Sequence, residues 1–135
     1  MNKIEHIGIA VKNLEASNKL FEKLFGTAHY KTEEVASEEV KTSFFMAGPN
    51  KVELLEGLGE DSPIAKFIEK KGEGIHHIAF EVDDIKAEIA RLSAEGFQVL
   101  NESPKKGADN KLVAFLHPKS ANGVLVELCQ EIKIE

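Results

Sequence analysis

Two histidines occupy equivalent positions in two similar stretches of this sequence. When residues 4–16 are aligned with residues 75–87 without a gap, His6 falls on His77, and a valine follows each of them five residues later. Both stretches alternate apolar and polar residues, as a strand with one buried face does. A single histidine in such a strand more often packs in a core than binds a ligand. Two histidines at the same point of a repeat favour a shared role.

Two glutamates are matched in the same way. Glu53 lies in the apolar segment 52–55 and Glu127 in the apolar segment 126–129, each directly after a valine and before a leucine. A carboxylate among valine and leucine side chains loses its hydration at a large cost in free energy unless it is paired or bound to a metal. A salt bridge at the edge of a strand would be the alternative explanation for each glutamate alone. Their equivalence in the two halves favours a metal site.

The four residues together have the composition of a divalent-metal site, with His6, Glu53, His77 and Glu127 as the expected ligands. Two neutral imidazoles and two carboxylates balance the charge of a divalent cation. Mixed nitrogen and oxygen donors suit Co²⁺, Mn²⁺, Fe²⁺, Ni²⁺ or Zn²⁺ better than Mg²⁺ or Ca²⁺. An octahedral ion with four protein ligands keeps two adjacent positions, which can accept a chelating substrate.

Three helices are predicted from capping residues, glycine stops and helical spacing. They should run from Asn13 to Gly26, from Ser62 to Gly72, and from Asp83 or Asp84 to Gly96. The inward positions expected in the first helix are Leu14, Ser17, Leu20, Phe21, Leu24 and Phe25. In the last helix they are Ile85, Ile89 and Leu92. The helix over residues 62–72 would link the two halves of the repeat.

Strand-like segments follow the first and the last helix, so each half of the chain has the predicted order βαβββ. The segments are residues 29–32, 40–46, 51–56, 97–100, 112–116 and 123–130. A four-stranded sheet with one helix cannot cover both of its faces. We therefore expect an α+β fold in which two tandem modules, about residues 1–60 and 73–135, form curved mixed sheets around a shared metal-binding cleft.

The composition of the chain restricts the binding partners and the cellular location that can be expected. The chain has 135 residues and a formal net charge of -6, which argues against a nucleic acid held through its phosphates. No apolar stretch approaches the ~20 residues that span a bilayer, so no membrane partner is expected. The single cysteine, Cys129, cannot form an internal disulfide, and a strand-like segment begins at once after the first residues. These features predict a cytoplasmic protein.

Several segments taken together resemble the methylmalonyl-CoA epimerases of the vicinal-oxygen-chelate superfamily, which also contains glyoxalase I and extradiol dioxygenases. The segments are residues 6–11, 52–55, 61–65, 74–82 and 115–128, and the resemblance covers essentially the whole chain. The pair His76-His77, followed by His117-Pro118-Lys119, is the most specific combination. The first histidine motif alone marks only the superfamily.

The resemblance implies a glyoxalase/bleomycin-resistance-like fold and a metal-dependent epimerase. Such an enzyme interconverts (R)- and (S)-methylmalonyl-CoA by proton abstraction at C2 through a metal-stabilised enolate. It further implies an acyl-CoA substrate, a homodimer, and a divalent ion, with Co²⁺ expected first and Mn²⁺, Ni²⁺ or Zn²⁺ as alternatives. The neighbouring lysines Lys105, Lys106 and Lys111 could meet the phosphates of coenzyme A.

The resemblance also implies that Glu127 is both a metal ligand and one of two proton carriers. The glutamate that some relatives use as the second carrier corresponds here to Thr42, which is no base. Glu38, Glu39 and a metal-bound water remain as candidates for the second carrier.

Other functions within the same superfamily fit the sequence less well. A glyoxalase I-like lyase usually needs basic residues for the glutathione carboxylates, but the one arginine, Arg91, lies on a predicted outer helix. An extradiol dioxygenase would use three ligands for Fe²⁺, and Glu53 would be a fourth. A non-catalytic binding protein of the superfamily would lack the ligands altogether.

Overall fold

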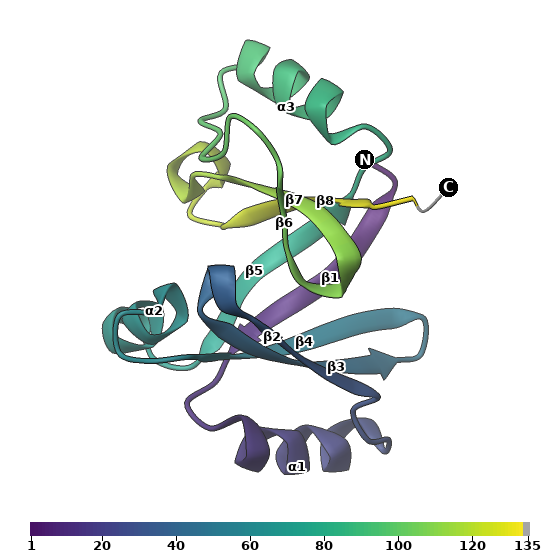
Figure 1. Cartoon of the computed structure of the whole chain (residues 1–135), viewed down its shortest axis with the longest axis vertical. Coiled ribbons are helices and arrows are strands. Elements are labelled where there is room, and N and C mark those ends of the chain that lie inside the picture. The colour runs from purple at the N-terminus through teal and green to yellow at the C-terminus, as the bar shows by residue number, and fades with distance from the viewer. Residues whose placement is uncertain (134–135) are drawn as a thin grey trace. The chain divides into compact units, whose positions relative to one another are not determined.

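The order of helices and strands repeats once along the chain. The computed structural model describes residues 1–133. The principal elements are β1 (Lys3–Ala10), α1 (Leu14–Phe25), β2 (Lys31–Val35), β3 (Val40–Ala47), β4 (Asn50–Gly57), α2 (Pro63–Lys71), β5 (Gly74–Glu81), α3 (Ile85–Ala94), β6 (Lys105–Lys106), β7 (Lys111–Leu116) and β8 (Val126–Glu131) (Figure 1). The predicted order βαβββ is therefore present twice, with α2 between the two copies, and the α+β class is confirmed.

The chain divides into two units. The N-terminal unit is His6–His76, and the C-terminal unit consists of Met1–Glu5 together with the chain from His77 onward. No helix in the described residues 1–133 combines the length and the apolar character needed to cross a membrane.

In the N-terminal unit the strands lie in the order β2-β3-β4-β1. β2, β3 and β4 are antiparallel neighbours, whereas β1 pairs with β4 in parallel. The parallel pair is possible because α1 and the two strands after it carry the chain back across the sheet. The side chain of Asn13 caps α1 by accepting a hydrogen bond from the backbone N–H of Ala16, and Gly26 ends the helix in the left-handed conformation.

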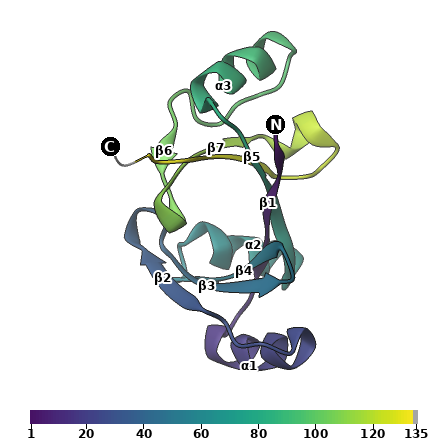
Figure 2. The same cartoon turned by 90° about the vertical axis from the view of Figure 1, so that its right-hand side faces the viewer.

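Two helices cover opposite faces of this sheet (Figure 2). On one face, Leu14 of α1 joins a buried cluster with Phe45 and Leu54. On the other face, Ile64 of α2 packs with Ala10 and Leu55. Because the side chains of a strand alternate between faces, neighbouring residues of β4 serve different cores.

The C-terminal unit has the same pairing, in the order β5-β8-β7-β6. β5 and β8 are parallel, and β7 is antiparallel to both β8 and β6. Ile85, Ile89 and Leu92 of α3 are buried against the sheet, as predicted. Asp84 caps the helix through Ala87, and the side chain of Gln130 on β8 accepts a hydrogen bond from the backbone N–H of Ile85 at 2.7 Å.

One strand prediction is wrong. Residues 97–100 form only an isolated bridge, from Val99 to Leu116, and the strand next to β7 is the two-residue β6. The side chain of Asn101 accepts a hydrogen bond from the backbone N–H of Phe115 at 2.9 Å and so replaces a backbone partner in the ladder. Pro104 follows and has no N–H to donate. Both residues interrupt what the apolar pattern alone predicts as one strand.

Two further predictions need correction. Leu20 and Leu24 of α1 are 63% and 68% exposed, although they were expected to face inward. Each lies one residue, and so about 100°, before Phe21 or Phe25, whose rings reach the buried Phe45. The apolar stripe of the helix is thus wider than the face that packs. The last strand also begins later than residue 123, because the turn after η3 (Pro118–Ala121) continues to Val124.

The contact between Gly57 and Ser62 gives a test of how α2 is fixed to β4. A Cβ atom on Gly57 would lie 2.1 Å from the hydroxyl of Ser62, which caps α2 and is fully buried. Gly57→Ala should therefore lower the free energy of unfolding by about 1–3 kcal/mol. Ser62→Ala should cost about 1 kcal/mol through loss of the cap. The double variant should be more stable than the sum of the two effects predicts, because removing the hydroxyl relieves the clash. Additive effects in urea denaturation would contradict this contact.

Candidate functional site

The first histidine–glutamate pair lies in the N-terminal unit, on the face of the sheet that α2 also covers. Gly8 of β1 is opposite Glu53 of β4, so His6, two residues earlier, projects from the same face as Glu53. Its Nδ1 atom is 3.1 Å from Oε2 of Glu53. The two residues are only 5% and 4% exposed. The parallel pairing of β1 and β4 thus brings a buried carboxylate to a buried imidazole.

A lysine joins this pair, and the sequence analysis did not single it out. Lys51 lies opposite His6 in the β1–β4 register, and its Nζ atom is 3.5 Å from Oε2 of Glu53. It is the one lysine among residues 1–133 that is buried, with 8% exposure. The signal in the sequence is its position two residues before Glu53, which places both side chains on one face of a strand.

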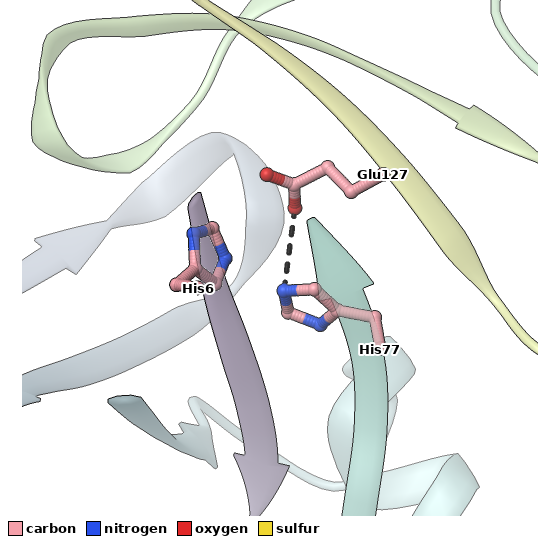
Figure 3. A group of neighbouring side chains, drawn as sticks. All are labelled: His6, His77 and Glu127. Atoms are coloured by element: carbon pink, nitrogen blue, oxygen red, sulfur yellow. Dashed lines mark ion pairs between the residues drawn. The ribbon is translucent and has the colours of Figure 1, made fainter. Parts of the chain in front are cut away.

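The second pair lies in the C-terminal unit. Figure 3 shows the ring of His77, on β5, turned toward the carboxylate of Glu127, on β8, with 3.4 Å between Nε2 and Oε1. Both residues are buried, at 5% and 7% exposure. Phe115 is opposite Glu127 in the β7–β8 register, and its ring meets the His77 ring edge-on at 6.2 Å between centroids.

The two pairs are built alike. Ala79 is opposite Glu127, as Gly8 is opposite Glu53, so each histidine lies two residues before the partner of its glutamate. A phenylalanine is opposite each glutamate on the antiparallel side, Phe44 in one unit and Phe115 in the other. Each unit therefore offers one imidazole and one carboxylate, both withdrawn from water, which is a donor set that suits a transition-metal ion.

Thr42, at the position expected for a second proton carrier, is fully buried on β3. It is opposite Leu55, so it shares the face that carries Glu53. Its hydroxyl has no hydrogen-bond partner among the described residues. Of the other two candidates, Glu38 ends a short 3-10 turn and Glu39 follows it in the left-handed conformation, outside the strands.

The other three histidines make contacts of different kinds. The ring of His76 meets Phe67 of α2 edge-on at 4.9 Å between centroids, and burial lowers its pKa from 6.5 to about 4. His117 caps the short turn after β7, accepting a hydrogen bond from the backbone N–H of Lys119 at 3.0 Å. His29 is partly exposed and pairs with Glu22 at 3.2 Å.

Comparison with known proteins agrees with this construction. The family model of the glyoxalase/bleomycin resistance protein/dioxygenase superfamily matches residues 5–115. The methylmalonyl-CoA epimerase of Dictyostelium discoideum is 43% identical over 129 residues, which are 95% of this chain and 78% of the relative. An ethylmalonyl-CoA/methylmalonyl-CoA epimerase of Cereibacter sphaeroides is 43% identical over 96% of this chain and 98% of its own length.

A solved structure is also similar over the whole chain. A variant of Streptomyces coelicolor methylmalonyl-CoA epimerase, in complex with 2-nitronate-propionyl-CoA, matches with a TM-score of 0.93 and 34% identity, covering 98% of this chain and 99% of that chain. The chain belongs to the glyoxalase/bleomycin resistance protein/dioxygenase superfamily and has its fold. The predicted resemblance to methylmalonyl-CoA epimerases is confirmed, and with it the prediction of an enzyme of the epimerase class.

The partly buried ring of His76 predicts a pH dependence of stability. Its pKa is about 4 in the folded protein against 6.5 ordinarily, so between these values the unfolded chain binds a proton that the folded chain does not. The free energy of unfolding of the metal-free protein should fall by up to ~3 kcal/mol as the pH drops from 6.5 to 4. His76→Phe should lose this dependence, whereas His29→Phe should keep it. Equal slopes for all three proteins in urea denaturation would contradict the assignment.

Proposed function

We propose that this protein is a metal-dependent epimerase that interconverts (R)- and (S)-methylmalonyl-CoA by removing and returning the proton at C2. The observation that carries the proposal is the pair of buried histidine–glutamate contacts, which occur in the same register in both units. The names of the relatives indicate the substrate class. Removal of the proton at C2 leaves a negative charge that must be stabilised, and a divalent cation can stabilise it.

One ion per chain would be held by all four residues, His6, Glu53, His77 and Glu127. His6 with Glu53, or His77 with Glu127, gives two donors, which are too few for a tight site, while four donors leave two positions of an octahedral ion for a chelating ligand. The bound ion would act as a Lewis acid toward the thioester carbonyl of the substrate. Co²⁺ is the ion we expect first, with Mn²⁺, Ni²⁺ and Zn²⁺ as alternatives.

Glu127 would also carry the proton on one face of C2. Glu127 lies on β8, between β5, which carries His77, and β7, which carries Phe115. The apolar residues Ala79, Val113 and Cys129 share its face of the sheet. A carboxylate in such surroundings is poorly hydrated, which suits it to proton transfer at carbon. The second carrier stays open between Glu38, Glu39 and a metal-bound water, because Thr42 cannot accept a proton from carbon.

Binding of the coenzyme A moiety is assigned to lysines near β6. Lys105 and Lys106 form this exposed strand, and Lys111 begins β7 beside it. A lysine ammonium group is a common partner of phosphate groups. A glyoxalase I-like lyase is disfavoured, since the one arginine, Arg91, lies on α3 and is engaged by Glu88. Homodimerisation and a cytoplasmic location complete the proposal.

Metal analysis of histidine variants tests whether one ion is shared. His6→Ala and His77→Ala alter different units, and each should abolish the binding of about one equivalent of Co²⁺ per chain. Two independent sites would instead leave one ion bound in each variant. The control is His29→Ala, which removes a histidine–glutamate pair of similar length that is partly exposed. Full occupancy in both His6→Ala and His77→Ala would refute the shared site.

Exchange of the C2 proton of methylmalonyl-CoA for a deuteron in heavy water tests the role of Glu127. Glu127→Gln keeps the shape and one oxygen donor but removes the basicity, so it should retain much of its metal and lose ~10²–10⁴-fold in exchange rate. Glu53→Gln is the matched control in the other unit and should lose much less at equal metal occupancy. If both variants exchange at similar rates, Glu127 is a ligand only.

A further inference from the structure

The β2–β3 register places a further glutamate on the face of the sheet that carries Glu53. Glu33 of β2 is directly opposite Thr42 of β3, and Thr42 is in turn opposite Leu55 of β4. Leu55 lies two residues after Glu53, so both project from the same face of β4. Glu33 therefore shares this face with Glu53, and their strands are about 10 Å apart. No spacing along the chain relates the two glutamates; only the strand register does.

The two glutamates in the turn after β2 lack such a placement. Glu38 ends a 3-10 turn, and Glu39 follows it in the left-handed conformation with a φ of 53°. Neither belongs to a strand, so the alternation of side chains along a strand does not direct them toward the face of Glu53. Glu34, the next residue on β2, projects from the other face. Within β2 and β3, Glu33 is thus the carboxylate on the face of Glu53.

The surroundings of Glu33 suit a group that exchanges protons with a ligand and with solvent. Its side chain is 35% exposed and makes an ion pair with Lys31 at 3.8 Å. Exposed ion pairs contribute little to stability, so the carboxylate can leave Lys31 when a ligand arrives. The hydroxyl of Thr42, its opposite neighbour, is buried and has no hydrogen-bond partner among residues 1–133. A buried hydroxyl without a partner is destabilising, which independently indicates that a polar ligand group binds beside Glu33.

The other half of the repeat does not preserve this carboxylate. Two residues before the phenylalanine opposite each buried glutamate stand Thr42 in the N-terminal unit and Val113 in the C-terminal unit. Glu33 is opposite Thr42, whereas Lys105 of β6 is opposite Val113. The same point of the fold thus has a carboxylate in one half and an ammonium group in the other. The fold itself does not require a carboxylate here.

We propose that Glu33 is the second of the two proton carriers. The inference rests on the proposed function, which supplies the substrate and the carrier on the opposite face of C2. The ionised carboxylate of Glu33 takes the proton from C2, and the electron pair of the C–H bond moves into the thioester carbonyl. The carrier on the opposite face then returns a proton to C2, which inverts the configuration. In the reverse direction the protonated Glu33 returns its proton, so no further reactant is needed.

Four variants separate a proton carrier from a residue that only supports the sheet. Glu33→Gln keeps the shape of the side chain without its basicity, and Glu33→Asp keeps the basicity on a shorter side chain. Glu34→Gln removes the same charge from the other face of the same strand. Lys31→Met breaks the ion pair and leaves the carboxylate of Glu33 in place. Circular dichroism verifies folding, and Glu33→Thr replaces Glu33→Gln if that variant does not fold.

The test follows each C2 epimer of methylmalonyl-CoA separately in heavy water, with Co²⁺-loaded proteins, and records both deuterium content and configuration. Glu33→Gln should invert both epimers ~10²–10⁴-fold more slowly. It should still exchange the C2 proton of one epimer within about threefold of the unaltered rate, because the carrier on the other face remains. Exchange from the other epimer should fall together with inversion. Glu33→Asp should invert faster than Glu33→Gln, and Glu34→Gln and Lys31→Met should behave like the unaltered protein.

Calorimetric titration of the metal-free proteins provides a readout without turnover. Glu33→Gln should bind Co²⁺ as the unaltered protein does, because Glu33 is not a ligand. Normal inversion by Glu33→Gln, or weaker Co²⁺ binding, would overturn the inference. Equal loss of exchange from both epimers would also overturn it, because a residue that only binds the substrate affects the two faces of C2 alike. Absence of exchange from either epimer with the unaltered loaded protein would instead refute the proposed function, on which the inference depends.

Discussion

The cost of removing carboxylates from water is the constraint on which the construction of this protein depends. Glu53 and Glu127 each stand between a valine and a leucine in a strand, and each is almost completely buried. Such a group must have a partner. In both units the partner is a histidine on the adjacent parallel strand. The histidine lies two residues before the residue that is directly opposite the glutamate. The parallel pairs β1–β4 and β5–β8 are therefore what makes burial of each carboxylate possible.

The helices and remaining strands follow from this requirement. A parallel pair cannot be closed by a tight turn, so the chain must leave the sheet, form α1 or α3, and return through two antiparallel strands. The same connection places a phenylalanine opposite each glutamate, and its helix covers the face of the sheet opposite to the glutamate. Repetition of one βαβββ order thus produces two similar pairs, and the N-terminal pair has Lys51 beside its glutamate where the other half of the repeat has Leu125.

The wrong predictions from the sequence have a common origin, because an apolar pattern carries limited information about packing. Leu20 and Leu24 satisfy helical spacing but lie outside the part of α1 that meets the sheet, and residues 97–100 have the composition of a strand without forming one. A pattern records which residues can be buried. It does not record how wide the packing face is, or that the side chain of Asn101 takes the place of a backbone partner.

The sequence by itself determined the duplicated order of elements, the three helices and their caps, and the four matched histidines and glutamates. Those features depend on local spacing and on repetition along the chain. Only the tertiary structure decided that Lys51 is buried against Glu53, that His76 packs on Phe67, and that Thr42 has a buried hydroxyl on the face of Glu53. These are consequences of strand register and of helix placement, which bring together residues that no spacing along the sequence relates.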